Sequence, residues 1–120
     1  MEYTVKFYED KKKRKPVEEF LLGLSVKARA KVTKSLEILQ SQGVLTPYPH
    51  VSHVKDKLFE LRVKQSKNQY RVIYFINTGR SIILLHGFVK TSRQIEASDI
   101  EISEKRYQDF IERYENENTK

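Results

Sequence analysis

Basic side chains recur along the second half of this sequence, inside segments that are otherwise mostly apolar. Arg62 lies in the segment ELR, Arg71 in YRV, and both His86 and Lys90 in LHGFVK. Planar guanidinium groups match the geometry of phosphate and carboxylate groups. The two arginines therefore predict an anion-binding site. A lone histidine on a half-buried strand is more often a hydrogen-bonded structural residue, and this remains the alternative for His86.

Loop lengths predict how these residues lie relative to one another. Short loops separate three predicted strands, which favours an antiparallel meander; the strands are Leu58–Lys64, Gln69–Asn77 and Ser81–Val89. If residues 65–68 form a four-residue loop, Lys64 pairs with Gln69. Arg62 then lies directly opposite Arg71 on one face of the sheet.

The next hairpin extends this row of charges. If Thr78 and Gly79 form a two-residue turn, Arg71 lies opposite His86, and Lys90 continues the same face one step further out. A slip of one residue would move these side chains to the opposite face, so the prediction depends on the turn.

The same register predicts a core face and a mixed face. The core face, which we expect the early helices to cover, holds Phe59, Leu61, Val63, Tyr70, Val72, Tyr74, Ile76, Ile83, Leu85 and Val89. The mixed face is apolar at one end, where the last helix can pack on Ile73, Phe75, Ile82 and Leu84. Glu60 lies near the basic end, and its pairing with one arginine would be a purely structural explanation of that charge.

Other segments complete an α+β domain. In chain order we predict a strand at Tyr3–Tyr8, a short helix that begins at Pro16, a second helix capped by Ser25 and stopped at Gly43, a loop at Thr46–Lys57 and a last helix opening at the capping box Ser98–Glu101. The predicted order is β-α-α-β-β-β-α, a small antiparallel or mixed sheet with an N-terminal helical hairpin on one face. We expect one domain over residues 1–115 and a frayed tail at 116–120.

Composition restricts the function classes. The net charge is +7, and it divides into +11 over residues 1–95 and −4 over residues 96–120. A basic body suits a polyanion such as nucleic acid, or an acidic protein partner. The absence of cysteine excludes disulfides and thiolate metal sites. His50 and His53 have no ligand cluster around them, so we expect no metal and no cofactor. No apolar segment suits a signal peptide or a membrane span, and we expect a cytoplasmic protein.

The strings LFELRV, YRVIYF and ILLHGFVK, in this order, resemble the phage Gp49-like, HigB-type branch of the RelE/ParE toxin superfamily. The resemblance covers most of the chain, including the order of the elements, and implies a RelE-like fold. It implies a type II toxin–antitoxin toxin that cleaves mRNA on translating ribosomes. It also implies a cognate antitoxin, usually a helix-turn-helix protein, through which alone the toxin would reach operator DNA.

The resemblance also implies roles for the basic row. Arg62 and Arg71 would hold a phosphate while the 2′-hydroxyl attacks it without a metal, and Lys90, or in its place His86, would move protons. Further RNA contacts would come from Phe88 by stacking and from the basic residues Lys64, Arg93, Lys27, Arg29, Lys31 and Lys34. Relatives often carry a second lysine after the first, but here Lys90 is followed by Thr91-Ser92-Arg93-Gln94.

Two other functions fit the same resemblance. The chain could inhibit DNA gyrase without catalysis, as in the ParE branch. It could also be a weakly active or inactive homologue that retains antitoxin binding, because the second lysine is missing. A protein target such as gyrase requires no phosphate cradle, so the basic row favours the ribonuclease over the gyrase inhibitor.

Overall fold

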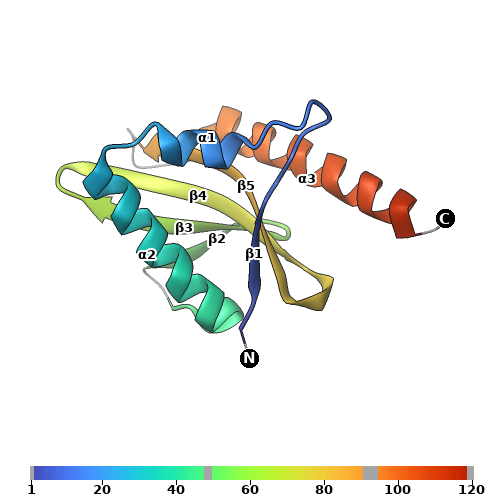
Figure 1. Ribbon diagram of the computed structural model, residues 1–120, viewed down its shortest axis with the longest axis horizontal. Coiled ribbons are helices and arrows are strands. Elements are labelled where there is room, and N and C mark those ends of the chain that lie inside the picture. The colour runs from blue at the N-terminus through green and yellow to red at the C-terminus, as the bar shows by residue number, and fades with distance from the viewer. Residues whose placement is uncertain (1, 48–49, 91–94, 119–120) are drawn as a thin grey trace.

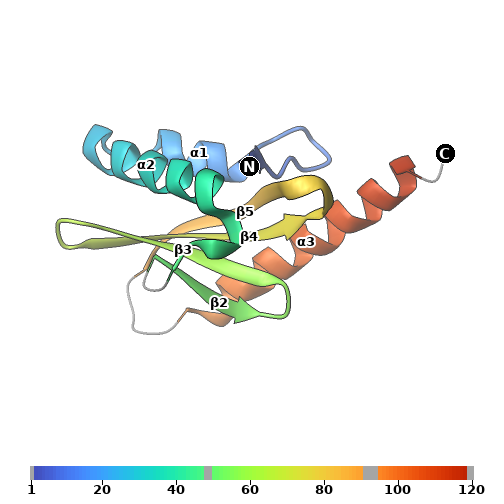
Figure 2. The same cartoon turned by 90° about the horizontal axis from the view of Figure 1, so that it is seen from below.

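Helices cover both faces of a mixed sheet in this protein (Figure 1, Figure 2). The computed structural model describes residues 2–47, 50–90 and 95–118, with side chains described up to residue 114. The elements are β1 (Thr4–Phe7), α1 (Pro16–Leu22), α2 (Val26–Gln42), β2 (Val51–Lys55), β3 (Leu58–Gln65), β4 (Asn68–Asn77), β5 (Ser81–Lys90) and α3 (Ala97–Asn118). Among the described residues the sheet has five strands in the order β1-β5-β4-β3-β2, with β1 parallel to β5. The predicted α+β class is confirmed.

The two N-terminal helices begin and end at their predicted signals. Pro16 is the first residue of α1, and the Ser25 hydroxyl accepts a hydrogen bond from the Ala28 N–H at 3.2 Å, capping α2. Gly43 ends α2 with a φ of 51°. A Cβ at this position would overlap the ring of Tyr3, so both the backbone conformation and the packing require glycine.

Arg29 closes the corner between α1 and α2. Its guanidinium donates to the carbonyl oxygens of Leu21, Leu22 and Leu24 at 3.1 to 3.3 Å. Carbonyls at the end of a helix lack intrahelical donors, so these bonds hold the turn in place. The fold therefore uses the charge that the sequence suggested for RNA contact.

The segment predicted as a loop over Thr46–Lys57 contains a strand. β2 pairs antiparallel with the first half of β3, beginning with Val51 opposite Leu61. The strand is five residues long, lies at the edge of the sheet and carries the polar residues Ser52 and His53. Such a short edge strand has too little apolar alternation to be recognised by its pattern. The predicted order of elements is therefore wrong by one strand.

The register between β3 and β4 is confirmed. Arg62 lies directly opposite Arg71, as the hairpin predicted. The pairing continues to Gln65 and Asn68, so the turn has two residues instead of four, and Ser66 adopts the positive φ of 57° that a tight turn needs. Shortening the loop by one pair leaves the register unchanged.

The register between β4 and β5 differs from the prediction in two steps. The connection is a three-residue turn at Thr78–Arg80, and Asn77 pairs with Ser81. Further along, Tyr74 lies opposite Leu84 but Ile73 lies opposite His86, which leaves Leu85 as the extra residue of a bulge.

These two shifts change the partners of the basic row. Arg71 lies opposite Phe88, and not opposite His86 as predicted. Because the two one-residue shifts add up to two residues, the outer half of β5 keeps its predicted face, and Lys90 pairs with Gln69 beside Arg71. Between the turn and the bulge the faces are exchanged.

The core consequently forms two layers, one on each face of the sheet. Under α1 and α2 lie Leu61, Val63, Tyr70, Val72, Tyr74, Ile82 and Leu84, together with Val17, Val32 and Leu39. Under α3 lie Tyr8, Leu58, Ile73, Phe75, Ile83 and Leu85. The predicted assignment of Ile82–Leu85 to the two faces was therefore wrong.

Helix α3 packs its apolar side across the sheet. Tyr107 and Phe110 both meet Phe75 edge to face, with ring centroids 4.7 and 5.5 Å apart. The carbonyl of Glu96 accepts the first backbone bonds, so the helix begins one residue before Ser98, and the predicted capping box is wrong. Its backbone is helical to Asn118. None of the described helices is both long enough and apolar enough to span a bilayer.

Candidate anion-binding site

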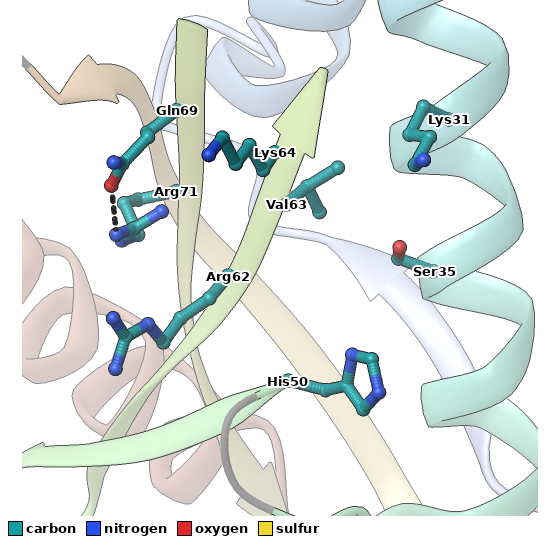
Figure 3. Close-up of a pocket in the computed structure, with 8 residues that line it drawn as sticks. All are labelled: Lys31, Ser35, His50, Arg62, Val63, Lys64, Gln69 and Arg71. Atoms are coloured by element: carbon teal, nitrogen blue, oxygen red, sulfur yellow. Dashed lines mark hydrogen bonds between the residues drawn. The ribbon is translucent and has the colours of Figure 1, made fainter. Parts of the chain in front are cut away.

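A cavity of about 420 Å³ opens at the free edge of β3, beyond the point where β2 begins (Figure 3). It is lined by Lys31, Ser35, His50, Arg62, Val63, Lys64, Gln69 and Arg71. The backbone N–H of Arg62 donates to the carbonyl of His50 at 2.7 Å, and the later residues of β3 have no partner on β2. The cavity therefore opens where β2 begins, because β2 pairs with β3 only as far as Leu61.

Arg71 is buried at the back of this cavity, with 3% of the residue exposed. Its guanidinium donates to the side-chain oxygen of Gln69 at 2.7 Å and to the carbonyl of Tyr70 at 3.2 Å. Burial lowers the pKa of Arg71, the charge of Glu60 raises it, and that of Arg62 lowers it. An arginine nevertheless stays protonated, so the site holds a fixed, oriented positive charge.

Glu60 supplies the negative charge beside Arg71. One of its carboxylate oxygens lies 3.7 Å from the Arg71 Nε and accepts a hydrogen bond from the Ser52 hydroxyl at 3.0 Å. Its other oxygen has no protein hydrogen-bond partner among the described residues, nor does the Arg71 Nε. The predicted pairing of Glu60 with one arginine is therefore present as an ion pair, but without a hydrogen bond at the Arg71 Nε.

Arg62 and Lys64 bring further positive charge to the same face. Arg62 is half-buried and pairs with Arg71 across the sheet, whereas Lys64 is exposed. Like charges on opposite strand positions cost about 0.2–1 kcal/mol. The Glu60 carboxylate beside Arg71 offsets part of this cost, and a bound anion would offset more.

Lys90 belongs to the same cluster. It pairs with Gln69 across the sheet. Burial lowers the pKa of Lys90, the charge of Arg71 lowers it further, Glu60 raises it, and Arg62 lowers it. The charges of both arginines and of the carboxylate therefore act on the Lys90 ammonium group. Its neutral form is more accessible than in an ordinary lysine, which suits proton transfer.

His86 lies outside this cluster and holds α3. Its Nε2 lies 2.8 Å from a carboxylate oxygen of Asp99, and its Nδ1 lies 3.4 Å from the Arg106 guanidinium. Arginine can only donate, so Nδ1 accepts and Nε2 carries the proton that is donated to Asp99. Burial lowers the pKa of His86, the hydrogen bond that His86 donates to Asp99 raises it, and the charge of Arg106 lowers it again. These contacts favour the structural interpretation.

The other predicted contact residues are spread over three elements. Phe88 faces Arg71 and stacks on His86 with ring centroids 5.2 Å apart, and it also packs on the core layer under α3. The three lysines Lys27, Lys31 and Lys34 are exposed along α2, but only Lys31 lines the cavity. Arg93 lies outside the described residues.

Sequence reasoning missed the residues that orient the charges. Gln69 precedes Arg71 by two residues, and side chains two apart share a face of a strand, so this contact was open to prediction. Ser52 lies in the segment predicted to be a loop, so the sequence gives no sign of its contact with Glu60. Asp99 and Arg106 lie 13 and 20 residues from His86, and no local pattern connects them.

A metal centre has no counterpart in the described part of the chain, where no three His, Cys, Asp or Glu side chains gather. The cavity instead offers guanidinium, amine, amide, hydroxyl and imidazole groups. Such a set can bind an anion, hold it in one orientation and place an amine beside it.

One family model matches most of the chain. The family model described as phage-derived protein Gp49-like (DUF891) matches residues 19–108. The match contains α2, all of β2–β5 and the first half of α3, and therefore every described residue of the cavity. No curated protein matches the chain.

Proposed function

The chain belongs to the Gp49-like family of phage-derived proteins, which is associated with toxins of toxin–antitoxin systems, and we propose that it is a HigB-type, type II toxin that cleaves mRNA on the ribosome. The observation that carries this proposal is the direct pairing of Arg62 with Arg71 on the cavity face. Two oriented guanidinium groups suit the charge of a phosphate that is being cleaved.

The proposed reaction needs only the RNA, the side chains of the cavity and the neighbouring Lys90. The ribose 2′-oxygen forms a bond to the adjacent phosphorus, and the bond from that phosphorus to the 5′-oxygen of the next nucleotide breaks. A base removes the 2′-hydroxyl proton and an acid protonates the departing 5′-oxygen. The products are a 2′,3′-cyclic phosphate end and a 5′-hydroxyl end.

The geometry suggests a division of roles. Arg62, half-buried at the cavity, would contact the phosphate directly. Arg71 is held by Gln69 and would stabilise the developing negative charge from behind. Lys90 would transfer a proton, because burial and the charges of both arginines lower its pKa. In this proposal His86 fastens α3 to the sheet and does not move protons.

Partners follow from the same proposal. The substrate would be mRNA on the translating ribosome, where the basic surface would meet ribosomal RNA with a strong dependence on salt. A cognate antitoxin would neutralise the toxin, and operator DNA would be reached only through that antitoxin. The positive charge of residues 1–95 favours an antitoxin element that is acidic or amphipathic.

Induction of the protein in a bacterial host tests the proposal. The 5′ ends of cellular mRNA are mapped for the wild type, Arg62→Ala and the control Lys57→Ala, whose exposed lysine precedes β3 at the end remote from the cavity. We expect new 5′-hydroxyl ends with the wild type and the control, and about 10²–10³-fold less cleavage with Arg62→Ala. Undiminished cleavage by folded Arg62→Ala would contradict the assignment. A DNA damage response without new ends would favour gyrase inhibition.

A further inference from the structure

The cavity continues around the edge of β3 to the side covered by α2. In Figure 3 the side chains of Arg62, Arg71 and Gln69 lie on one side of the β3–β4 hairpin. Those of Lys31, Ser35 and His50 lie on the other side and line the same cavity. The reaction proposed above uses only the first side, so the second has no role yet.

Among the described residues, no strand pairs with β3 along the edge between the two sides. In an antiparallel strand the N–H and C=O groups of alternate residues point to the same edge. Because the Arg62 N–H points to the β2 side and bonds His50, the Lys64 N–H points to that side too, beyond the start of β2. A chain that crosses this edge therefore meets a backbone donor between the two groups of side chains.

The charge on the second side also suits a polyanion. None of the residues that line the cavity carries a carboxylate, and the second side offers the ammonium group of Lys31, the hydroxyl of Ser35 and the ring of His50. Lys31 and His50 are exposed, so a ligand can reach both without displacing the core. Lysine binds phosphate as a mobile point charge, and hydroxyl and imidazole groups can donate further hydrogen bonds to the phosphate oxygens.

We propose that this second side binds a neighbouring phosphate of the RNA, with Lys31 as its charged contact and Ser35 and His50 as hydrogen-bonding partners. The RNA would cross the free edge of β3, with the reacting phosphate at Arg62 and the next one at Lys31. This inference rests on the proposed function, because it takes RNA as the substrate. It gives Lys31 a role that its neighbours on α2 lack.

Two short RNAs separate this site from the reacting one. Both carry 2′-O-methyl groups that prevent cleavage; the dinucleotide has one phosphate and the trinucleotide has two. Affinities are measured by titration, following the backbone amide resonances of Lys31, Ser35 and Arg62. We expect the trinucleotide to bind wild-type protein at least fivefold more tightly than the dinucleotide. Its salt dependence should be steeper by about 0.7 in log–log slope, because one further phosphate is neutralised.

Substitutions on α2 assign that gain to one lysine. Lys31→Ala should reduce the trinucleotide preference to near one, whereas Lys27→Ala and Lys34→Ala, which alter exposed lysines outside the cavity on the same helix, should preserve it. All three sites are exposed, so the variants should fold alike. Equal loss with Lys27→Ala or Lys34→Ala would overturn the proposal, as would equal affinity of wild type for the two RNAs.

The failure of this inference is distinguishable from failure of the proposed function. A protein that cleaves mRNA on ribosomes in an Arg62-dependent manner, but binds both RNAs equally, would retain the function and lose the second phosphate site. A protein that shows no Arg62-dependent cleavage would lose the function, whatever the oligonucleotides do.

Discussion

The Glu60 carboxylate and the Arg71 guanidinium form a buried ion pair, with 3.7 Å between Oε1 and Nε. That separation is too long for a hydrogen bond, and the bonds that hold each group come from elsewhere, Ser52 for the carboxylate and Gln69 for the guanidinium. The pair therefore balances charge without filling the hydrogen-bonding capacity of Arg71. The arrangement keeps a positive charge in place that a phosphate can use.

Glu60→Gln should destabilise the fold. The substitution keeps the shape but leaves the Arg71 charge buried without compensation, which costs about 3 kcal/mol of unfolding free energy. Urea unfolding at pH 7 measures it. The exposed Glu101→Gln on α3 is the control and should change stability by less than about 0.5 kcal/mol. The double variant Glu60→Gln/Arg71→Met should recover most of the loss; equal midpoints for wild type and Glu60→Gln would contradict the ion pair.

Stability should fall on mild acidification because of His86. Burial places its folded-state pKa below the ordinary value of about 6.5, so the unfolded chain binds the proton more readily. The stabilisation is complete above pH ~6.5 and is lost as pH falls from there towards the folded-state pKa. In that window an Nδ1 proton would face the Arg106 guanidinium, which already donates there.

Thermal unfolding between pH 7.5 and 5 measures this effect. The wild type should lose stability across the window, and His86→Gln should be less stable at pH 7.5 but flatter with pH. His50→Gln, at an exposed site, is the matched control. Parallel pH curves for the wild type and His86→Gln would show that another group causes the dependence.

Gln69 should act as a positioning residue for Arg71. Its side-chain oxygen accepts from the guanidinium at 2.7 Å, so Gln69→Ala would free the charge to reorient. We expect kcat for ribosome-bound mRNA to fall about tenfold with KM nearly unchanged, because misplacement weakens transition-state contacts more than binding.

The control for Gln69 is Lys67→Ala, at an exposed position in the neighbouring turn. It should leave kcat unchanged. Unfolding by urea should place both variants within about 1 kcal/mol of the wild type, because Gln69 itself is exposed. A tenfold rise in KM at constant kcat for Gln69→Ala would mean that Gln69 binds RNA directly.

Local features of the sequence were enough to predict several parts of the fold. Pro16, Ser25 and Gly43 set the ends of the first two helices through caps and backbone conformation that involve only near neighbours. The pairing of Arg62 with Arg71 was predictable for the same reason, since a tight hairpin relates residues only nine apart. The chemistry of the site followed from that pairing.

Other features depended on contacts that no local pattern contains. The three-residue turn at Thr78–Arg80 and the bulge at Leu85 each shift β5 by one residue, and together they place His86 opposite Ile73 instead of Arg71. Strand β2 was not predicted because pairing with β3 stabilises it, whereas its sequence lacks the alternation of apolar and polar residues that marks a strand.

The sequence by itself therefore determined which residues carry charge, where the first helices begin and end, and which two arginines share a face. The tertiary structure decided which of those charges are buried and which remain accessible. Burial of Arg71 needs Glu60 and Gln69 beside it, and the cavity needs β2 to begin at Val51 and leave the end of β3 open. The accessibility of a charge depends on how separate elements pack together, so the spacing of residues along the sequence does not predict it.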